Sequence, residues 1–398
     1  MEHKTRIKGN VHYVGVNDRN KHRFEGMWPL PYGVSYNSYL IDDEMVALVD
    51  TVDICYFEVY LRKIKQVIGE RPINYLIINH MEPDHSGSIR LIKQHYPEII
   101  IVGNKQTFGM IEGFYGVTGE QYLVKEGDFL ALGHHKLRFY MTPMVHWPET
   151  MMTFDETDGV LFSGDGFGCF GTVDGGFLYT RINVDKYWGE MVRYYSNIVG
   201  KYGSPVQKAL QKLGGLPISA ICSTHGPVWT ENIAKVIGIY DRLSRYDADE
   251  GVVIAYGSMY GNTEQMAEAI AEELSAQGVK NIVMHNVTKS HPSYIIADIF
   301  RYKGLIIGSP TYSNQIFPEV EALLSKILLR EVKGRYLGYF GSFTWAGAAV
   351  KRLAEFAEKS KFELVGDPVE MKQAMKDLTY TQCENLARAM ADRLKKDR

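Results

Sequence analysis

Residues 80–85 constrain this chain most, because they place four metal-binding side chains within six positions. The segment reads His80-x-Glu82-x-Asp84-His85, with Pro83 at its centre. Imidazole and carboxylate ligands together suit Zn, Fe or Mn better than a soft copper site. The first two ligands can face one metal, and the last two, nearer a following helix, can face another. Pro83 restricts the backbone of its neighbours. The segment therefore predicts a two-metal site.

Three single residues farther along the chain are candidates to complete this site. His146, Asp165 and His225 each follow an apolar predicted strand, and glycine or proline lies close to each of them. A lone His after a strand is more often a cap or a surface residue, and Asp before Gly more often marks a turn. The cluster at 80–85 shifts the interpretation of all three toward ligation. The pair His134-His135, in a turn flanked by Gly and Lys, is interpreted as a surface feature instead.

The length of 398 residues favours two domains, because single cores stop growing at roughly 250–300 residues. We predict domains at 1–250 and 251–398. Strands of the first domain repeatedly end in loops that carry His or Asp, which places the site on the rim of a sheet. From Gly251 onward, five predicted strands alternate with helices. This alternation predicts a doubly wound parallel sheet, joined to the first domain through a helix at 232–245 and a polar segment at 246–251.

Composition excludes several classes of protein. The net charge of −3 and the absence of a basic stretch argue against nucleic-acid binding. No run of 18 apolar residues predicts a membrane span, and the N-terminal residues lack the apolar core of a secretory signal. The four cysteines form no C-x-x-C pair, which disfavours zinc ribbons and a built-in rubredoxin-type centre. A reducing, cytoplasmic location is expected.

A second set of residues predicts binding of FMN. The strand 252–256 leads into a loop in which Ser258, Asn262 and Thr263 supply short polar side chains before a helix begins. A helix N-terminus with such a loop forms an anion cradle. The loop lacks the Lys of a Walker motif and the G-x-G-x-x-G of dinucleotide sites. One phosphate without a pyrophosphate indicates FMN, although an ordinary strand–turn–helix cap remains open for this loop alone.

Two later loops, at 309–314 and 342–347, strengthen the FMN interpretation. They follow the third and fourth strands, and ligands of such sheets bind beyond the carboxyl ends of the strands. Tyr312 and Trp345 are placed where a flavin ring could stack, with plain loop packing as the alternative for Trp345. The predicted FMN-binding residues are Ser258, Met259, Tyr260, Gly261, Asn262, Thr263, Pro310, Thr311, Tyr312, Asn314, Ser342, Phe343, Thr344, Trp345 and Gly347.

These motifs together resemble those of the flavodiiron proteins, or A-type flavoproteins. The cluster with its later His, Asp and His resembles the metallo-β-lactamase fold, an αββα sandwich, and Glu82 stands where the hydrolases carry His. The resemblance covers essentially the whole chain, because the family ends in a flavodoxin-like domain. Tyr260 departs from flavodoxins but resembles the aromatic residue of flavodiiron proteins. The resemblance implies one iron held by His80, Glu82 and His146, a second held by Asp84, His85 and His225, and Asp165 bridging both.

The resemblance implies that the protein is a reductase. It would reduce nitric oxide to nitrous oxide, dioxygen to water, or both, in protection against nitrosative and oxidative stress. Electrons would come from rubredoxin or a flavin-rubredoxin reductase through FMN, in a head-to-tail homodimer or a dimer of dimers. In some family members the His at position 85 is turned away from the metal, so two orientations are open. Tyr195 is the candidate catalytic residue, with Tyr194 and Trp147 beside it and aromatic core packing as the alternative.

Two other classes of function remain to be separated from the reductase. A zinc hydrolase of the metallo-β-lactamase type could use a metal-activated water, with the second domain as a flavin module. An electron carrier could use the FMN domain alone. Glu82, an additional anionic ligand, argues against the zinc hydrolase. The complete set of seven ligands argues against the electron carrier. The sequence does not choose between nitric oxide and dioxygen.

Overall fold

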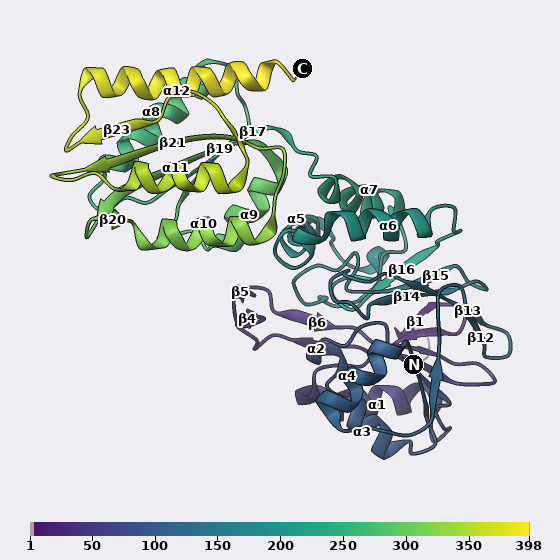
Figure 1. Cartoon of the computed structure of the whole chain (residues 1–398). Coiled ribbons are helices and arrows are strands. Elements are labelled where there is room, and N and C mark those ends of the chain that lie inside the picture. The colour runs from purple at the N-terminus through teal and green to yellow at the C-terminus, as the bar shows by residue number, and fades with distance from the viewer. Residues whose placement is uncertain (1–3, 398) are drawn as a thin grey trace. The chain divides into compact units, whose positions relative to one another are not determined.

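The chain forms two compact units, Met1–Ser244 and Arg245–Arg398. We describe them from a computed structural model, which covers residues 4–397 (Figure 1). The polar segment 246–251 belongs to the second unit, because strand β17 (Asp249–Tyr256) begins inside it and Arg335 donates a hydrogen bond of 2.9 Å to the Tyr246 carbonyl. The division between the units therefore precedes the boundary expected after residue 250.

The first unit contains two large sheets. One sheet has the strand order β1-β2-β7-β8-β9-β10-β11 and the other the order β12-β13-β14-β15-β16. The first comprises β1 (Arg6–Lys8), β2 (Val11–Tyr13), β7 (Tyr39–Ile41), β8 (Ala47–Val49), β9 (Tyr75–Ile77), β10 (Ile100–Gly103) and β11 (Gln121–Leu123). The second comprises β12 (Phe129–Ala131), β13 (Lys136–Met141), β14 (Met151–Asp155), β15 (Val160–Gly164) and β16 (Ala220–Ser223).

Short ribbons and helices complete the first unit. The ribbons are β3 (Val16–Asp18) with β6 (Val34–Tyr36) and β4 (Arg23–Phe24) with β5 (Trp28–Pro29). The helices are α1 (Phe57–Ile68), α2 (Pro83–Ser86), α3 (Ile89–His95), α4 (Lys105–Tyr115), α5 (Asp185–Tyr194), α6 (Gly203–Leu213) and α7 (Ile233–Ser244). In Figure 1, α1, α3 and α4 lie on the side of the first sheet, whereas α6 and α7 lie on the side of the second.

The core of the first unit lies between the two sheets. Tyr39 and Ile77 from the first sheet pack in one buried cluster with Phe139, Phe162 and Cys222 from the second. Because helices cover the outer faces, the layers run helix, sheet, sheet, helix, and the predicted αββα sandwich is confirmed. The chain leaves the first sheet after β2, because β3 pairs with β6 in a separate ribbon.

The second unit contains one parallel sheet with strand order β18-β17-β19-β21-β22. Its other strands are β18 (Ile282–Asn286), β19 (Tyr302–Tyr312), β20 (Gln315–Ile316), β21 (Tyr336–Phe343), β22 (Glu363–Leu364) and β23 (Val369–Lys372). Its helices are α8 (Asn262–Ala276), α9 (Pro292–Arg301), α10 (Pro318–Arg330), α11 (Ala349–Ser360) and α12 (Asp377–Lys395). Helices α8 and α12 cover one face, and α10 and α11 the other (Figure 1). This is the predicted doubly wound, flavodoxin-like sheet.

Two segments of the second unit differ from the sequence prediction. The expected loop at 309–314 begins as the end of β19, which pairs with β20 as a hairpin. Its turn residues Ser313 and Asn314 both have positive φ, 47° and 58°, as a tight hairpin turn requires. Strand β23, which pairs with β21, was not predicted. Within residues 4–397, no helix is both long and apolar enough to span a membrane.

Candidate metal centre and flavin site

The structure brings all seven predicted ligands together where strands of both sheets end. His80 follows β9, and the short helix α2 carries Asp84 and His85 behind a proline at its first position. His146 lies between β13 and β14, and His225 follows β16. Gly164 ends β15 with φ of 54°, which side-chain-bearing residues rarely adopt, and turns the chain into Asp165, the remaining ligand.

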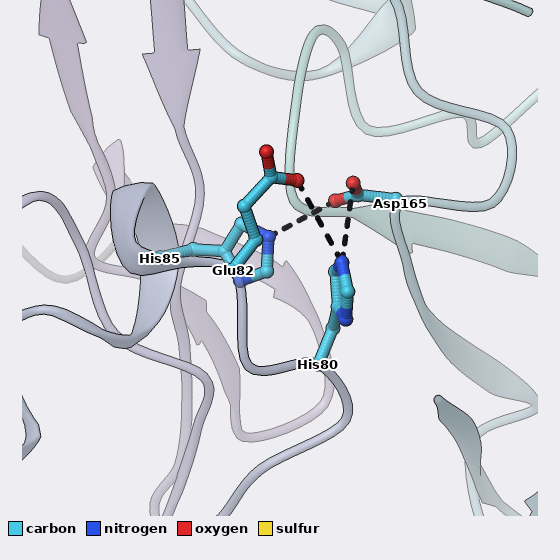
Figure 2. Close-up of side chains that lie close together, drawn as sticks. All are labelled: His80, Glu82, His85 and Asp165. Atoms are coloured by element: carbon cyan, nitrogen blue, oxygen red, sulfur yellow. Dashed lines mark ion pairs between the residues drawn. The ribbon is translucent and has the colours of Figure 1, made fainter. Parts of the chain in front are cut away.

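Four of these side chains form a first group. The Nε2 atom of His146 lies 3.1 Å from Glu82 Oε2 and 3.1 Å from Asp165 Oδ2. The Nε2 atom of His80 lies 3.7 Å from each of the same two oxygens. Figure 2 shows the carboxylates of Glu82 and Asp165 both directed at the His80 ring. The group therefore presents two imidazole nitrogens and two carboxylate oxygens to one point.

A second group forms on the other oxygen of Asp165. Its Oδ1 lies 3.2 Å from His85 Nε2 and 3.6 Å from His225 Nε2. Asp84 completes the group, with Oδ1 3.5 Å from His85 Nε2 and Oδ2 3.3 Å from His225 Nε2. Figure 2 shows the His85 ring facing Asp165. Each carboxylate oxygen of Asp165 thus belongs to a different group, as a bridging ligand requires.

The chemistry of these groups fits two metal cations. His80 Nε2 and His146 Nε2 lie 3.4 Å apart, although two neutral imidazoles cannot both direct lone pairs at each other favourably. Asp84 Oδ1 and Oδ2, His85 Nε2 and His225 Nε2 are buried without a hydrogen-bond partner among the described residues. Buried polar atoms without partners are costly, and metal ions between these atoms would satisfy them.

In the absence of metal, the neighbouring side chains shift the pKa values of Glu82 and His85 in opposite directions. Burial alone would raise the pKa of Glu82, but hydrogen bonds from His146 and His80 lower it to about 2. Burial would lower the pKa of His85, but the carboxylates of Asp84 and Asp165 raise it to about 10. Without metal, a proton on His85 therefore helps to balance the neighbouring carboxylates. A metal cation takes over this role, because metal ligands must be deprotonated.

Outer contacts orient the ligands, and the sequence reading did not identify them. His80 Nδ1 lies 2.7 Å from Oε1 of Glu149, which is 0% exposed. His225 Nδ1 donates to the Ser35 carbonyl at 2.8 Å. Such contacts set the tautomer and ring orientation of metal-binding imidazoles. Glu149 follows His146 closely in the sequence, which is a usable signal, whereas a backbone carbonyl carries none.

The three aromatic candidates lie at different places around the site. The Tyr194 ring lies 5.7 Å from the His225 ring, and Trp147 meets His80 edge-on at 5.3 Å. Tyr195, the candidate catalytic residue, packs against Tyr240 at 5.0 Å. The buried Tyr194 hydroxyl has no hydrogen-bond partner among the described residues. Of the two tyrosines, it is therefore Tyr194 whose ring the structure places against a predicted ligand.

A cavity of about 700 Å³ opens beside the metal centre. Glu82 and Asp84, one ligand from each group, form part of its wall. Phe24 also lines it and meets the His225 ring edge-on at 5.3 Å. The remaining wall carries charges of both signs, from Lys21 and Arg90 and from Glu25 and Asp53. The cavity gives small molecules access to both groups.

The predicted flavin segments also lie together, in the second unit. Ser258 Oγ accepts hydrogen bonds from Gly261 N at 3.1 Å and Glu264 N at 3.4 Å, which shapes the loop before α8. Thr263 Oγ1 and Ser342 Oγ lie 2.9 Å apart, so the first and third segments are tied together. Thr311 Oγ1, from the second segment, accepts from Ala348 N at 3.0 Å beside the third. These bonds hold all three segments at one end of the sheet.

The surface of these segments fits a flavin nucleotide. Gly261 has φ of 90°, and the space around its missing side chain is open, so a phosphate can approach the N-terminus of α8. Tyr260, Tyr312 and Trp345 are 90%, 49% and 80% exposed. Monomeric proteins rarely leave such rings uncovered in one place, and an isoalloxazine ring would cover them. The remaining predicted contacts, Met259, Asn262, Pro310, Asn314, Phe343, Thr344 and Gly347, belong to the same segments.

One histidine prediction is wrong. His135 was interpreted as a surface residue, but it is 1% exposed, and its Nδ1 lies 2.9 Å from Asp155 Oδ2. Its neighbour His134 is exposed as predicted. The turn that carries this pair points one ring outward and one inward. The inward ring is held by a carboxylate from β14 that lies far away in the sequence.

Comparisons with known proteins agree with this geometry. The chain matches the ODP family beta lactamase over residues 34–226 and the flavodoxin family over residues 254–385. It is 32% identical to the anaerobic nitric oxide reductase flavorubredoxin of Vibrio vulnificus, over 90% of this chain and 73% of that protein. This chain belongs to the flavodiiron protein family. It is therefore an oxidoreductase with FMN and a non-haem diiron site as its cofactors.

Solved structures of this family superpose on the whole chain. Rubredoxin oxygen:oxidoreductase from Desulfovibrio gigas is 31% identical, with a TM-score of 0.94 and 98% of both chains covered. The flavodiiron protein from Giardia intestinalis is 26% identical, with a TM-score of 0.91 and coverage of 98% of this chain and 97% of that one. The flavodiiron resemblance read from the motifs is thus confirmed.

Proposed function

We propose that this flavodiiron protein reduces nitric oxide to nitrous oxide, and dioxygen to water, at a site formed by His80, Glu82, Asp84, His85, His146, Asp165 and His225. The observation that carries the proposal is that the two carboxylate oxygens of Asp165 belong to different groups of ligands. The named activities of the Vibrio vulnificus and Desulfovibrio gigas relatives support it.

The ligands suit iron chemistry with small gases. A pair of iron ions held by these residues would bind the gas and supply electrons to it. Two NO, two electrons and two protons yield N2O and water, whereas O2 requires four electrons and four protons to yield two waters. Glu82 and Asp84 border the cavity, so a diatomic substrate reaches both positions. Glu82 adds negative charge where hydrolases carry a neutral His, which favours a redox-active pair over a zinc hydrolase.

We propose that Tyr194 positions a proton at the metal centre. Burial, followed by the charge of Asp165, raises the pKa of Tyr194 well above its usual value, so its hydroxyl stays protonated. The hydroxyl has no hydrogen-bond partner among the described residues, so it is free to donate to a bound substrate. Phe24 and Trp147 pack edge-on against the rings of His225 and His80 and add apolar surface next to these ligands.

Electrons reach this centre through FMN in our proposal. FMN bound between the α8 loop and the rings of Tyr312 and Trp345 would pass electrons singly. We propose a rubredoxin-type donor, since the name of the Desulfovibrio gigas relative includes rubredoxin and the cysteines of this chain are too scattered to form such a centre. We also propose a head-to-tail homodimer, in which the FMN of one chain serves the diiron site of its partner.

Cofactor analysis separates this proposal from the alternatives. We expect about two irons and one FMN per chain, with a flavin absorption spectrum that bleaches on reduction. Zinc in place of iron would favour a hydrolase, and FMN without any metal would favour an electron carrier. Anaerobic turnover with reduced rubredoxin then compares the substrates. We expect nitric oxide turnover to be at least as sustained as dioxygen turnover; rapid self-inactivation with nitric oxide alone would reverse that ranking.

A further inference from the structure

The directly coordinating side chains of the two metal positions are alike. Each group has two imidazoles, one carboxylate of its own and one oxygen of Asp165. Access from solvent is also similar, because Glu82 from the first group and Asp84 from the second both line the same cavity and are both 8% exposed. Any difference between the two positions must therefore come from the residues behind the ligands.

Behind the ligands, the two groups differ in charge. In the first group, His80 Nδ1 lies 2.7 Å from Oε1 of Glu149, a carboxylate with no exposed surface. In the second, His225 Nδ1 donates to the neutral carbonyl of Ser35. His85 Nδ1 is buried and has no hydrogen-bond partner among the described residues. Among residues 4–397, only the first group thus has an imidazole that is hydrogen-bonded to an anion behind it.

Glu149 is also built into the ligand loop. The same Oε1 accepts a hydrogen bond of 2.9 Å from Met81 N, the residue between two ligands. Its Oε2 is buried without a partner in the described part of the chain, so the negative charge is not spread over other donors. A carboxylate that accepts a hydrogen bond from a ligating imidazole raises the basicity of that ligand and fixes its tautomer.

We propose that Glu149 makes the two metal positions unequal, so that iron is held more tightly by His80, Glu82 and His146 than by Asp84, His85 and His225. Glu149 is a positioning residue, because it touches His80 and Met81 and not the metal. This inference rests on the proposed assignment of the ligands. It predicts that the second position, nearer His225, exchanges its metal first and is the more electron-poor of the two.

Another buried carboxylate offers a matched control. Asp50 is 2% exposed and accepts hydrogen bonds from Asn79 N at 2.8 Å and His80 N at 3.4 Å. It lies electrostatically near His85, but it makes no hydrogen bond to a ligand imidazole within residues 4–397. Asp50→Asn therefore removes a buried charge from the same neighbourhood without touching the contact that the proposal invokes. Asn also tolerates the positive φ of 52° at this position.

The experiment measures iron release from the reduced holoenzyme into an anaerobic solution of a coloured ferrous chelator. We expect two phases of about one iron each in the unmodified protein. Glu149→Gln, nearly isosteric and neutral, should accelerate the slow phase about 10–100-fold, the usual effect of losing an outer-shell partner, and leave the fast phase within twofold. Asp50→Asn should change neither phase. FMN content and far-UV circular dichroism verify that each variant is folded.

The outcomes distinguish a failure of the proposed role of Glu149 from a failure of the assignment of the metal ligands. His225→Ala should retain about one iron, released at the slow rate. If His225→Ala keeps two irons and both phases, the ligand assignment fails. If that variant behaves as expected but the unmodified protein releases both irons at one rate, or Glu149→Gln leaves the slow phase unchanged, the proposed role of Glu149 fails. Equal acceleration of both phases by Glu149→Gln and Asp50→Asn would also overturn it.

Discussion

The Nε2 atom of His85 lies 3.2 Å from Oδ1 of Asp165, so the His85 imidazole faces the metal centre. Of the two orientations open from the sequence, the structure has the inward one. We predict that His85→Ala lowers iron content from about two toward one per chain while FMN content stays unchanged. Metal analysis by plasma mass spectrometry measures this, with the exposed His134→Ala as the control. Full iron content in His85→Ala would show that His85 is not needed to hold metal.

Asp165 is expected to be the most sensitive ligand, because its two oxygens serve different groups. Asp165→Ala removes one oxygen from each group and leaves four imidazole nitrogens and the Thr224 hydroxyl without this carboxylate partner. We predict that at least one metal position is empty and that gas reduction falls below detection. Iron analysis after gel filtration decides this point, and two irons at full occupancy in Asp165→Ala would refute the bridging role.

The two buried tyrosines can be separated by removing their hydroxyl groups. Tyr194 lies against His225, whereas Tyr195 packs on Tyr240. Losing one preorganised hydrogen-bond donor at a reacting group typically costs about 10²–10³-fold, so we predict that Tyr194→Phe lowers kcat for gas reduction about 100-fold with iron content unchanged. Tyr195→Phe should lower it less than twofold. Solvent isotope effects and kcat are the measurements, and a larger loss in Tyr195→Phe would restore Tyr195 as the catalytic residue.

The pair His135–Asp155 gives a prediction about stability and pH. Burial would lower the pKa of His135, but Asp155 raises it above its usual value. Because the pKa of His135 is higher in the folded chain than in the unfolded chain, the pair stabilises the fold fully below the unfolded pKa of about 6.5. This stabilisation is lost as the pH rises through the pKa of the folded chain. Breaking a buried pair costs about 3–5 kcal/mol. We predict that Asp155→Asn lowers Tm more at pH 6 than at pH 9; an equal loss at both would contradict the linkage.

The head-to-tail arrangement can be tested by mixing two inactive chains. Asp165→Ala keeps the flavin loops but lacks a complete metal centre. Ser258→Glu places a carboxylate at the N-terminus of α8, where it repels the FMN phosphate, and Ser258→Ala serves as its uncharged control. If FMN of one chain serves iron of the other, subunit exchange between the inactive chains restores activity in the mixed dimer. Activity that stays at zero after exchange, verified by native mass spectrometry, would contradict this arrangement.

Sequence patterns predicted those features that depend on residues close together in the chain. The alternating strands and helices of the second unit and the predicted ligand His80 after β9 follow from periodicity and residue type. Glu149 and Ser35 were missed because a partner of an imidazole is chosen by three-dimensional folding, and any carboxylate or carbonyl can serve. His135 was misplaced for the same reason, since Asp155 lies on another strand. The preference for Tyr194 over Tyr195 depends on the helical direction of neighbouring side chains, which two adjacent tyrosines do not reveal in sequence.

The central claim is that this chain reduces nitric oxide at a carboxylate-bridged diiron centre that receives its electrons from FMN. The most direct measurement is anaerobic quantification of nitrous oxide by gas chromatography, with reduced rubredoxin as the donor and the iron- and FMN-loaded protein as the catalyst. We predict one N2O for every two NO consumed and for every two electrons taken from rubredoxin, and no N2O with Asp165→Ala. Oxidation of rubredoxin without N2O formation, or equal N2O formation by Asp165→Ala, would contradict the account.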